Sequence, residues 1–203
     1  MANRAVWHWL LTAAPLLLLV AGVFCALGGE DAVAAYFREH RAAHPDLTAC
    51  MRLVSDWAVP AFYPAYAWQL FRGVRDRDKR RLRLALGYAV AQILVSLLIV
   101  RALKIGIGRP RPDADGLFSP MSLDPGHHSL PSGHTTEATT AALPFALGLR
   151  RAALSLRLGL VVALVGASRI YLGWHHPSDL LAGLAVGSLA GLLVHRFAVR
   201  AEP

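Results

Sequence analysis

Three short segments in the second half of the chain combine cations, histidines and a carboxylate in a pattern that could transfer a phosphoryl group. The segments are 104–112 (KIGIGRPRP), 131–134 (PSGH) and 168–179 (SRIYLGWHHPSD). Arginine binds phosphate oxygens through paired, charge-assisted hydrogen bonds, and lysine adds a compact positive charge. We therefore expect Lys104, Arg111 and Arg169 to hold a phosphate together.

Two histidines add chemistry that cations alone cannot supply. A neutral imidazole attacks phosphorus when its tautomer is fixed, and Asp179, four residues after His175, can accept the proton on Nδ1 of His175. His175 is then the expected nucleophile, through Nε2. We expect His134 to protonate the leaving alkoxide and then to activate water. Ser132 and Gly133 precede an apolar block, so the free N–H groups of a helix start would help to bind the phosphate.

The composition indicates how these segments are positioned. Apolar residues make up 55% of the 203 residues, mean hydropathy is +0.43, and only 17% of residues are charged, against about a quarter in soluble domains. The apolar residues form blocks of the length that a helix needs to cross a bilayer. We therefore predict an all-α polytopic membrane protein. The basic residues lie between the blocks, so the net charge of +8 does not indicate a nucleic-acid partner.

The hydropathy pattern predicts six transmembrane helices within a single domain, 1–203. The predicted spans are 7–27, 53–71, 84–103, 135–149, 152–172 and 179–194. The second span is the least regular, since it contains Asp56, Pro60 and Pro64. The polar stretch 29–48 has an amphipathic character, and we expect it to form a helix on the membrane surface.

The distribution of basic residues predicts the orientation. Cytoplasmic loops of membrane proteins keep an excess of Lys and Arg, and residues 72–83 hold seven of the 21. Other basic residues, including Arg196 and Arg200, flank the remaining spans on the same side of the membrane as residues 72–83. Both termini are therefore expected to be cytoplasmic. The three motif segments then share the outer face of a bacterial plasma membrane. Cys25 and Cys50 could pair there, although two buried free thiols are the preferred interpretation.

The motif segments resemble the signature of the type 2 phosphatidic acid phosphatase (PAP2) superfamily. That signature is Lys, six residues, Arg-Pro; then Pro-Ser-Gly-His; then Ser-Arg, five residues, His, three residues, Asp, and all its fixed positions match. The resemblance implies a lipid phosphatase with a phosphohistidine intermediate and the residue roles given above. Family substrates include phosphatidic acid, phosphatidylglycerophosphate, undecaprenyl diphosphate and lipid A. No metal or other cofactor is expected, because the cations would stabilise the transferring group.

Other residues near the motifs have less specific expectations. Arg109 is expected to support the site structurally, because Arg111 holds the motif position. Glu137, one turn after His134, could pair with an arginine of the site or bind a lipid headgroup, and both remain open. Three further histidines are expected to be bystanders: His127, His128 and His176.

Several functional alternatives stay open at this point. The same signature serves vanadium haloperoxidases, although those resemble larger soluble proteins. A non-enzymatic lipid-binding or scaffold protein on the same fold is a second alternative, and the complete set of catalytic residues argues against it. A phosphotransferase between lipids, or a phosphatase for soluble esters, is a third. The identity of the lipid and the oligomeric state are not predicted.

Overall fold

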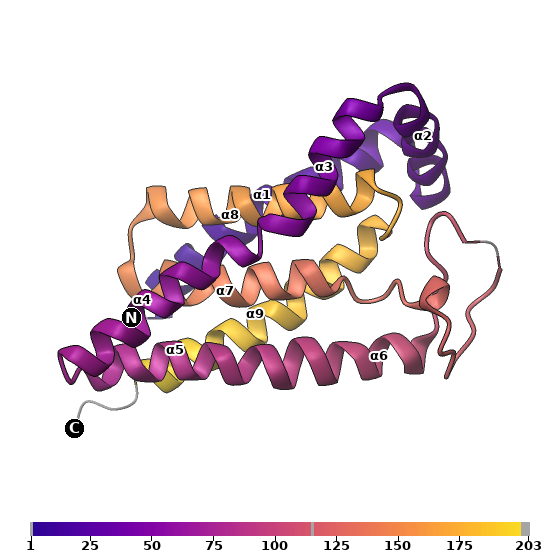
Figure 1. The fold of residues 1–203 in the computed structure, drawn as a ribbon. Helices are drawn as coiled ribbons and strands as arrows, with labels where there is room; N and C mark the ends of the chain where they lie inside the picture. Colours follow the sequence, from indigo (N-terminus) through magenta and orange to yellow (C-terminus); the bar gives the residue numbers. More distant parts are fainter. Residues whose placement is uncertain (1, 115, 200–203) are drawn as a thin grey trace.

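The computed structural model describes residues 2–114 and 116–199, and these form helices joined by loops, without a β-strand (Figure 1). Four helical segments are long and apolar enough to cross a membrane: Asn3–Leu27, Lys79–Ile107, Ala152–Tyr171 and Pro177–Val199. Many large apolar side chains of these segments are exposed, as a lipid-facing surface requires. The prediction of an all-α membrane protein is confirmed.

These four segments match the first, third, fifth and sixth predicted spans. Three of them are the single helices α1 (Ala2–Leu27), α8 (Ala152–Tyr171) and α9 (Pro177–Val199). The fourth is a continuous rod made of α5 (Lys79–Ala91), a π-helical stretch (Gln92–Ile99) and α6 (Val100–Ile107). Within the rod, the polar side chain of Gln92 donates to the Tyr88 hydroxyl at 2.8 Å and accepts from Ser96 at 2.7 Å. These polar groups are therefore satisfied inside an apolar element.

The other two predicted spans differ from a simple transmembrane helix. Residues 53–71 are divided among α3 (Pro45–Trp57), a 3₁₀ turn (Pro60–Phe62) and α4 (Tyr63–Arg75). Pro60 and Pro64 each stand at the start of a new element, because proline lacks the N–H that would continue a helix. α7 (Gly133–Leu149) has only 17 residues, most of them buried. Six crossings are therefore not established by helix length and hydropathy.

The centre of the fold is the packing of α7 against α9. Three glycines four residues apart on α9 face α7, and a Cβ on Gly187 would stand 2.6 Å from the Thr136 carbonyl oxygen. Small residues allow such close approach between membrane helices, so Gly183, Gly187 and Gly191 form the face through which α9 packs against α7. Three buried threonines of α7, Thr136, Thr139 and Thr140, donate to carbonyls one turn earlier, which satisfies their hydroxyls.

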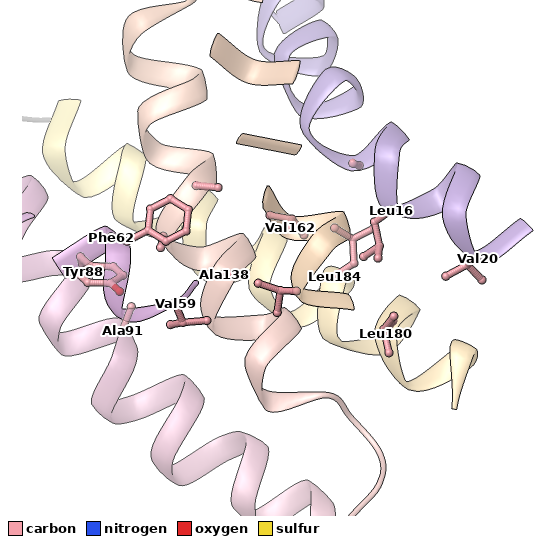
Figure 2. Close-up of a cluster of buried hydrophobic side chains, with 14 of the residues drawn as sticks. Leu16, Val20, Val59, Phe62, Tyr88, Ala91, Ala138, Val162, Leu180 and Leu184 are labelled. Atoms are coloured by element: carbon pink, nitrogen blue, oxygen red, sulfur yellow. The ribbon is translucent and has the colours of Figure 1, made fainter. Parts of the chain in front are cut away.

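Buried apolar side chains join the remaining helices to this centre. Figure 2 shows part of the cluster, in which Leu16 of α1, Val162 of α8, and Leu180 and Leu184 of α9 surround Ala138 of α7. Two hydrogen bonds also orient α1 relative to its neighbours. His8 contacts the Ser155 hydroxyl of α8 at 2.9 Å, and Trp9 donates to the Ser188 hydroxyl of α9 at 3.0 Å. α1 is thereby fixed against both α8 and α9.

The two ends of the bundle differ. α1 begins and α9 ends at one end, which also carries the basic α4–α5 and α7–α8 connections (Figure 1). At the other end lie the loop 109–132 and α2 (Glu30–Ala43), which continues into α3. The predicted helix within 29–48 is therefore present, and its relation to a membrane surface stays a prediction. Arg200, which contributed to the predicted orientation, lies outside the described residues.

The two cysteines are free, and both are exposed. The preferred interpretation of Cys25 and Cys50 as buried free thiols is therefore correct that they are unpaired and wrong that they are buried. Both lie on outward faces of their helices, where a small apolar thiol is compatible with lipid contact.

Candidate active site

The first motif segment leaves the rod through a tight turn. α6 ends at Ile107 and is capped by Gly108, whose φ of 62° is the left-handed conformation that favours glycine. A Cβ here would collide with the Ser119 carbonyl, and the Ser119 N–H donates to the Gly108 carbonyl at 2.7 Å. Lys104 is consequently held one turn before a loop that folds back over the end of the bundle.

Backbone hydrogen bonds then bring the three motif segments together. Within the loop, the Arg111 N–H donates to the Gly126 carbonyl at 2.8 Å, and the Ser129 N–H donates to the Arg109 carbonyl at 3.1 Å. The Ser132 N–H donates to the Asp179 carbonyl at 3.0 Å, which links the starts of α7 and α9. Residues far apart in sequence therefore share one site without depending on side-chain contacts alone.

His175 and Asp179 form a buried pair at the start of α9. Nδ1 of His175 lies 3.5 Å from Oδ2 of Asp179, a long contact by hydrogen-bond standards, and their exposed fractions are 2% and 0%. The same Oδ2 accepts hydrogen bonds from the Ser129 hydroxyl at 2.5 Å and the His176 N–H at 2.8 Å. Burial lowers the pKa of His175 to about 3, so the imidazole is neutral at pH 7.

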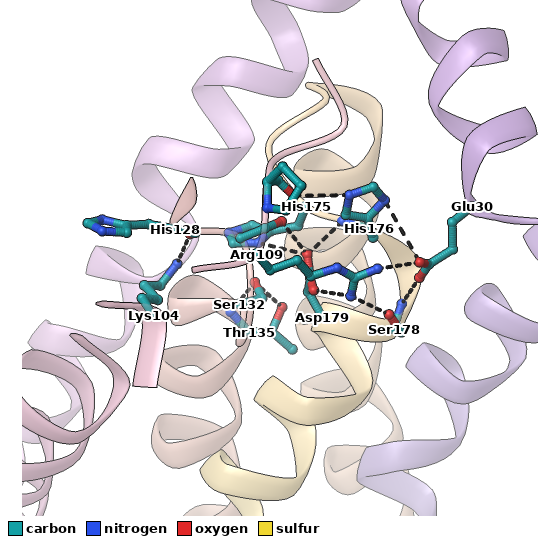
Figure 3. A network of polar contacts seen from close by, with 12 residues as sticks. Glu30, Lys104, Arg109, His128, Ser132, Thr135, His175, His176, Ser178 and Asp179 are labelled. Carbon is teal, nitrogen blue, oxygen red and sulfur yellow. Dashed lines mark hydrogen bonds and ion pairs between the residues drawn. The ribbon is translucent and has the colours of Figure 1, made fainter. Parts of the chain in front are cut away.

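Three cations surround this pair. Nζ of Lys104 donates to the His128 carbonyl at 2.7 Å (Figure 3), which leaves two of its three donors for another acceptor. Arg169 donates to the Ser55 hydroxyl at 2.6 Å, and its guanidinium lies 4.1 Å from the centre of the Trp174 ring. Within the described residues, the buried Nε groups of Arg111 and Arg169 have no hydrogen-bond partner.

The start of α7 forms another side of the site. The Ser132 hydroxyl caps the helix by accepting from the backbone N–H and the side chain of Thr135, at 3.5 and 3.0 Å. Gly133 faces α6, since a Cβ on it would lie 4.0 Å from Cε of Lys104. His134 is half-buried and within electrostatic reach of all three cations. All eight residues of the predicted site therefore gather at one end of the bundle.

The neighbouring residues that had weaker expectations are also placed. Arg109 supports the site as expected, because it donates to Oδ1 of Asp179 at 2.6 Å and to the Ser178 hydroxyl at 2.7 Å. His128 and His176 contact the site through their backbones. Glu137 is half-buried and makes no ion pair in the described part of the chain. The described residues also contain no group of three or more His, Cys, Asp or Glu that could hold a metal.

Sequence reasoning did not find several residues of the site. Ser129 binds Asp179, while Ser55 and Trp174 hold Arg169. Glu30, on the first turn of α2, pairs with Arg109. No spacing rule marks these residues. The only available signal was that Glu30 is an acidic residue directly after an apolar block, and this signal is common in membrane proteins.

Comparisons with known proteins agree with this geometry. The model of the PAP2 superfamily matches residues 82–203. The chain is 36% identical over 113 residues to a lipid A 1-phosphatase of Rhizobium etli, covering 52% of this chain and 47% of that protein. It is 34% identical over 110 residues to phosphatidylglycerophosphatase B of Bacillus subtilis, covering 49% and 51%. The chain thus spans about half the length of these curated relatives.

A solved structure resembles nearly the whole chain. It is the crystal structure of a transmembrane PAP2-type phosphatidylglycerolphosphate phosphatase from Bacillus subtilis, with a TM-score of 0.61. The likeness covers 92% of this chain and 96% of that one at 24% identity. At this identity the likeness establishes the fold, and with 92% of this chain covered it extends beyond the segment that the family model matches.

Proposed function

The chain belongs to the PAP2 superfamily, and we propose that it is an integral-membrane lipid phosphatase that works through a phosphohistidine on His175. Its substrate is a phosphate monoester or diphosphate of a lipid. The curated relatives named above act, by their names, on lipid A and phosphatidylglycerophosphate. Another relative, from Mycobacterium tuberculosis, is a decaprenylphosphoryl-5-phosphoribose phosphatase, 35% identical over 119 residues, covering 58% of this chain and 62% of that protein.

The observation that carries this proposal is that Arg111 and Arg169 each bury an Nε donor without a partner in the described residues, beside a neutral histidine. Buried polar groups in folded proteins are almost always hydrogen-bonded. Arg111 and Arg169 nevertheless each bury an Nε donor without an acceptor in the described residues. An anion with several oxygens between them satisfies both donors. A phosphate placed there also lies next to Lys104 and His175.

The reaction proceeds in two steps. Nε2 of His175 attacks the phosphorus, a P–N bond forms, and the P–O bond to the lipid breaks while His134 donates a proton to the leaving oxygen. His134 then takes a proton from water, which attacks the phosphorus and breaks the P–N bond to release inorganic phosphate. Asp179 orients His175 through Nδ1 and stabilises the positive charge that develops on the ring. The three cations stabilise the charge on the transferring group.

The lipid reaches this site from the side of the bilayer. We propose that the α3–α4 segment and α7 complete six crossings, with both termini in the cytoplasm and the site at the outer face of a bacterial plasma membrane. The basic connections at the opposite end of the bundle support this orientation. The lipid tails then remain in hydrocarbon while the phosphate reaches the cations.

Phosphate release by the detergent-purified protein, with EDTA present, tests the proposal. The lipid panel holds phosphatidic acid, phosphatidylglycerophosphate, undecaprenyl diphosphate and lipid A. We expect release from at least one lipid, and its loss in His175→Ala with the fold retained. Undiminished activity in that variant would show that His175 is not the nucleophile. Loss of the substrate lipid without free phosphate, with its phosphate recovered on a second lipid supplied as acceptor, would identify a phosphotransferase.

The intermediate can be tested separately. With ³²P-labelled substrate, a rapid acid-free quench is expected to trap label on the wild-type protein in an acid-labile, base-stable form, as a P–N bond requires. His134→Ala retains the nucleophile but lacks the group that protonates the leaving oxygen and activates water, so its label is expected to form more slowly than in wild type and, once formed, to be lost more slowly. Label in His175→Ala would contradict the assignment.

A further inference from the structure

Glu30 connects α2 to the reacting end of the bundle through both oxygens of its carboxylate. Oε2 pairs with the guanidinium of Arg109, and Oε1 accepts a hydrogen bond from the Ser178 N–H at 3.1 Å (Figure 3). Ser178 is in the first turn of α9, where backbone N–H groups have no partner inside the helix. A residue of α2, outside the segment that the family model matches, therefore holds the start of α9.

Arg109 lies between two carboxylates. It donates to Oδ1 of Asp179 at 2.6 Å on one side and pairs with Glu30 on the other, and its side chain is only 12% exposed. A guanidinium has donors in a rigid planar fork. Asp179 and the Ser178 hydroxyl both accept from Nη1 of Arg109, whereas Glu30 accepts from Nη2. Glu30 therefore holds the second arm of the fork and so fixes the plane in which Arg109 meets Asp179.

The carboxylate of Glu30 is charged at neutral pH. Burial raises its pKa, but the hydrogen bonds from Ser178 and the positive charge of Arg109 outweigh burial, and the pKa is lower than usual. Charge-assisted hydrogen bonds of this kind are stronger than neutral ones. Glutamine has the same shape but only one oxygen acceptor, so it can keep only one of the two contacts, with Arg109 or with the Ser178 N–H.

We infer that Glu30 is a positioning residue of the reaction, acting through Arg109 on Asp179 and hence on His175. It holds Oδ2 of Asp179 toward Nδ1 of His175 by fixing Oδ1 on Arg109. It also keeps Arg109 bound to the carboxylates of Glu30 and Asp179, so that the Arg109 side chain does not rotate toward the substrate phosphate. The inference rests on the proposed function, since it assigns a role in the same reaction.

A purely structural role is the alternative, and the chain offers a control for it. Asp113 pairs with Arg38 at 3.3 Å and Arg41 at 2.7 Å and thereby ties α2 to the loop after α6. It contacts neither Arg109 nor Asp179 in the described contacts. Asp113→Asn should therefore loosen α2 without altering the carboxylate pair. Asp31→Asn removes an exposed charge from the same first turn as Glu30 and controls for charge alone.

The kinetic experiment compares Glu30→Gln with these two controls in the lipid phosphatase assay. We expect kcat of Glu30→Gln to fall about tenfold, the scale of one lost hydrogen bond to a charged group. KM should stay within about twofold or decrease, because a released Arg109 can only add to phosphate binding. Both controls should keep kcat within about twofold. Equal losses in Glu30→Gln and Asp113→Asn would overturn the inference, as would an unchanged kcat in Glu30→Gln.

A measurement without turnover separates this inference from the proposed function. In ¹⁵N-histidine NMR spectra, the His175 signals, assigned by their loss in His175→Gln, report which ring nitrogen carries the proton. We expect the Nδ1–H tautomer in the wild type and in both control variants, and a mixture of tautomers in Glu30→Gln. The same tautomer in Glu30→Gln as in wild type would refute the positioning role, whether or not any lipid of the panel is hydrolysed.

Discussion

The contact of Gly183 with the start of α7 allows a quantitative test of how strictly the fold positions the site. A Cβ on Gly183 would stand 2.7 Å from the Ser132 carbonyl oxygen and 3.0 Å from Cβ of Thr135. The first distance is about 0.7 Å shorter than ordinary van der Waals contact. The obstacle is backbone, which no change of rotamer can remove. Gly183→Ala must therefore push α9 away from α7 at this point.

This displacement of α9 would move Asp179 relative to the start of α7. Asp179 lies one turn before Gly183 on the same face of α9, and its carbonyl accepts the Ser132 N–H at 3.0 Å. Overpacking of this kind costs about 1–3 kcal/mol of stability. A misplacement approaching 1 Å reduces a rate by about a hundredfold, so kcat of Gly183→Ala is expected to fall by roughly 30- to 100-fold.

Gly191→Ala is the matched control for this prediction. It lies two turns further along the same face, where the nearest atom is Cβ of Leu143 at 3.0 Å, a smaller overlap than at Gly183 and one against a residue far along α7 from the site. We expect a smaller loss of thermal stability and kcat within about twofold of wild type. Phosphate release and thermal unfolding in detergent measure both effects. Full activity in Gly183→Ala, or equal rate losses in the two variants, would refute the argument that the α7–α9 junction positions Asp179.

Two further predictions concern the buried charges. The folded protein keeps His175 neutral down to about pH 3, whereas the unfolded chain binds a proton there near pH 6.5. Stability should therefore fall as the pH drops below 6.5, by about 2 kcal/mol from this residue at pH 5. His175→Asn should show a smaller decrease in unfolding temperature between pH 7 and pH 5, and an identical decrease would contradict the neutral state. Arg169→Lys keeps the charge but loses the planar fork that contacts Ser55 and Trp174, so kcat/KM should fall about tenfold or more while the fold is retained; unchanged kinetics would count against Arg169 as a phosphate ligand.

The sequence predicted which residues gather at one end of the bundle better than it predicted the helices around them. Residue type and spacing were sufficient to single out Lys104, Arg111 and Arg169 as neighbours because each belongs to a short segment with a fixed chemical pattern. The gathering of the segments followed from topology, since alternate connections of a helical bundle meet at the same end. The glycines of α9 were predictable for a similar reason, because a repeat of four residues defines one helix face.

Features that depend on tertiary contacts were not predictable. The division of 53–71 into separate elements depends on how Pro60 and Pro64 are packed, and hydropathy alone suggested one span. Burial of Cys25 and Cys50 was wrongly expected, because in a lipid environment an apolar side chain gains little by facing the protein interior. Glu30 was missed because its partner is 79 positions away and nothing near it in sequence indicates a role.

The contacts of α2 and α3 with the site also set the order in which the protein can become active during synthesis. Arg169 of α8 is held by Ser55 of α3, and Asp179 of α9 is linked through Arg109 to Glu30 of α2. Because α8 and α9 follow these elements in the chain, they must meet α3 and α2 before the charges of the site are balanced. A chain that has inserted only α1 to α7 contains His134, Lys104 and Arg111, but has neither His175 nor Asp179. The proposed reaction therefore requires α9 to be in place, and we do not expect it from a form inserted only as far as α7.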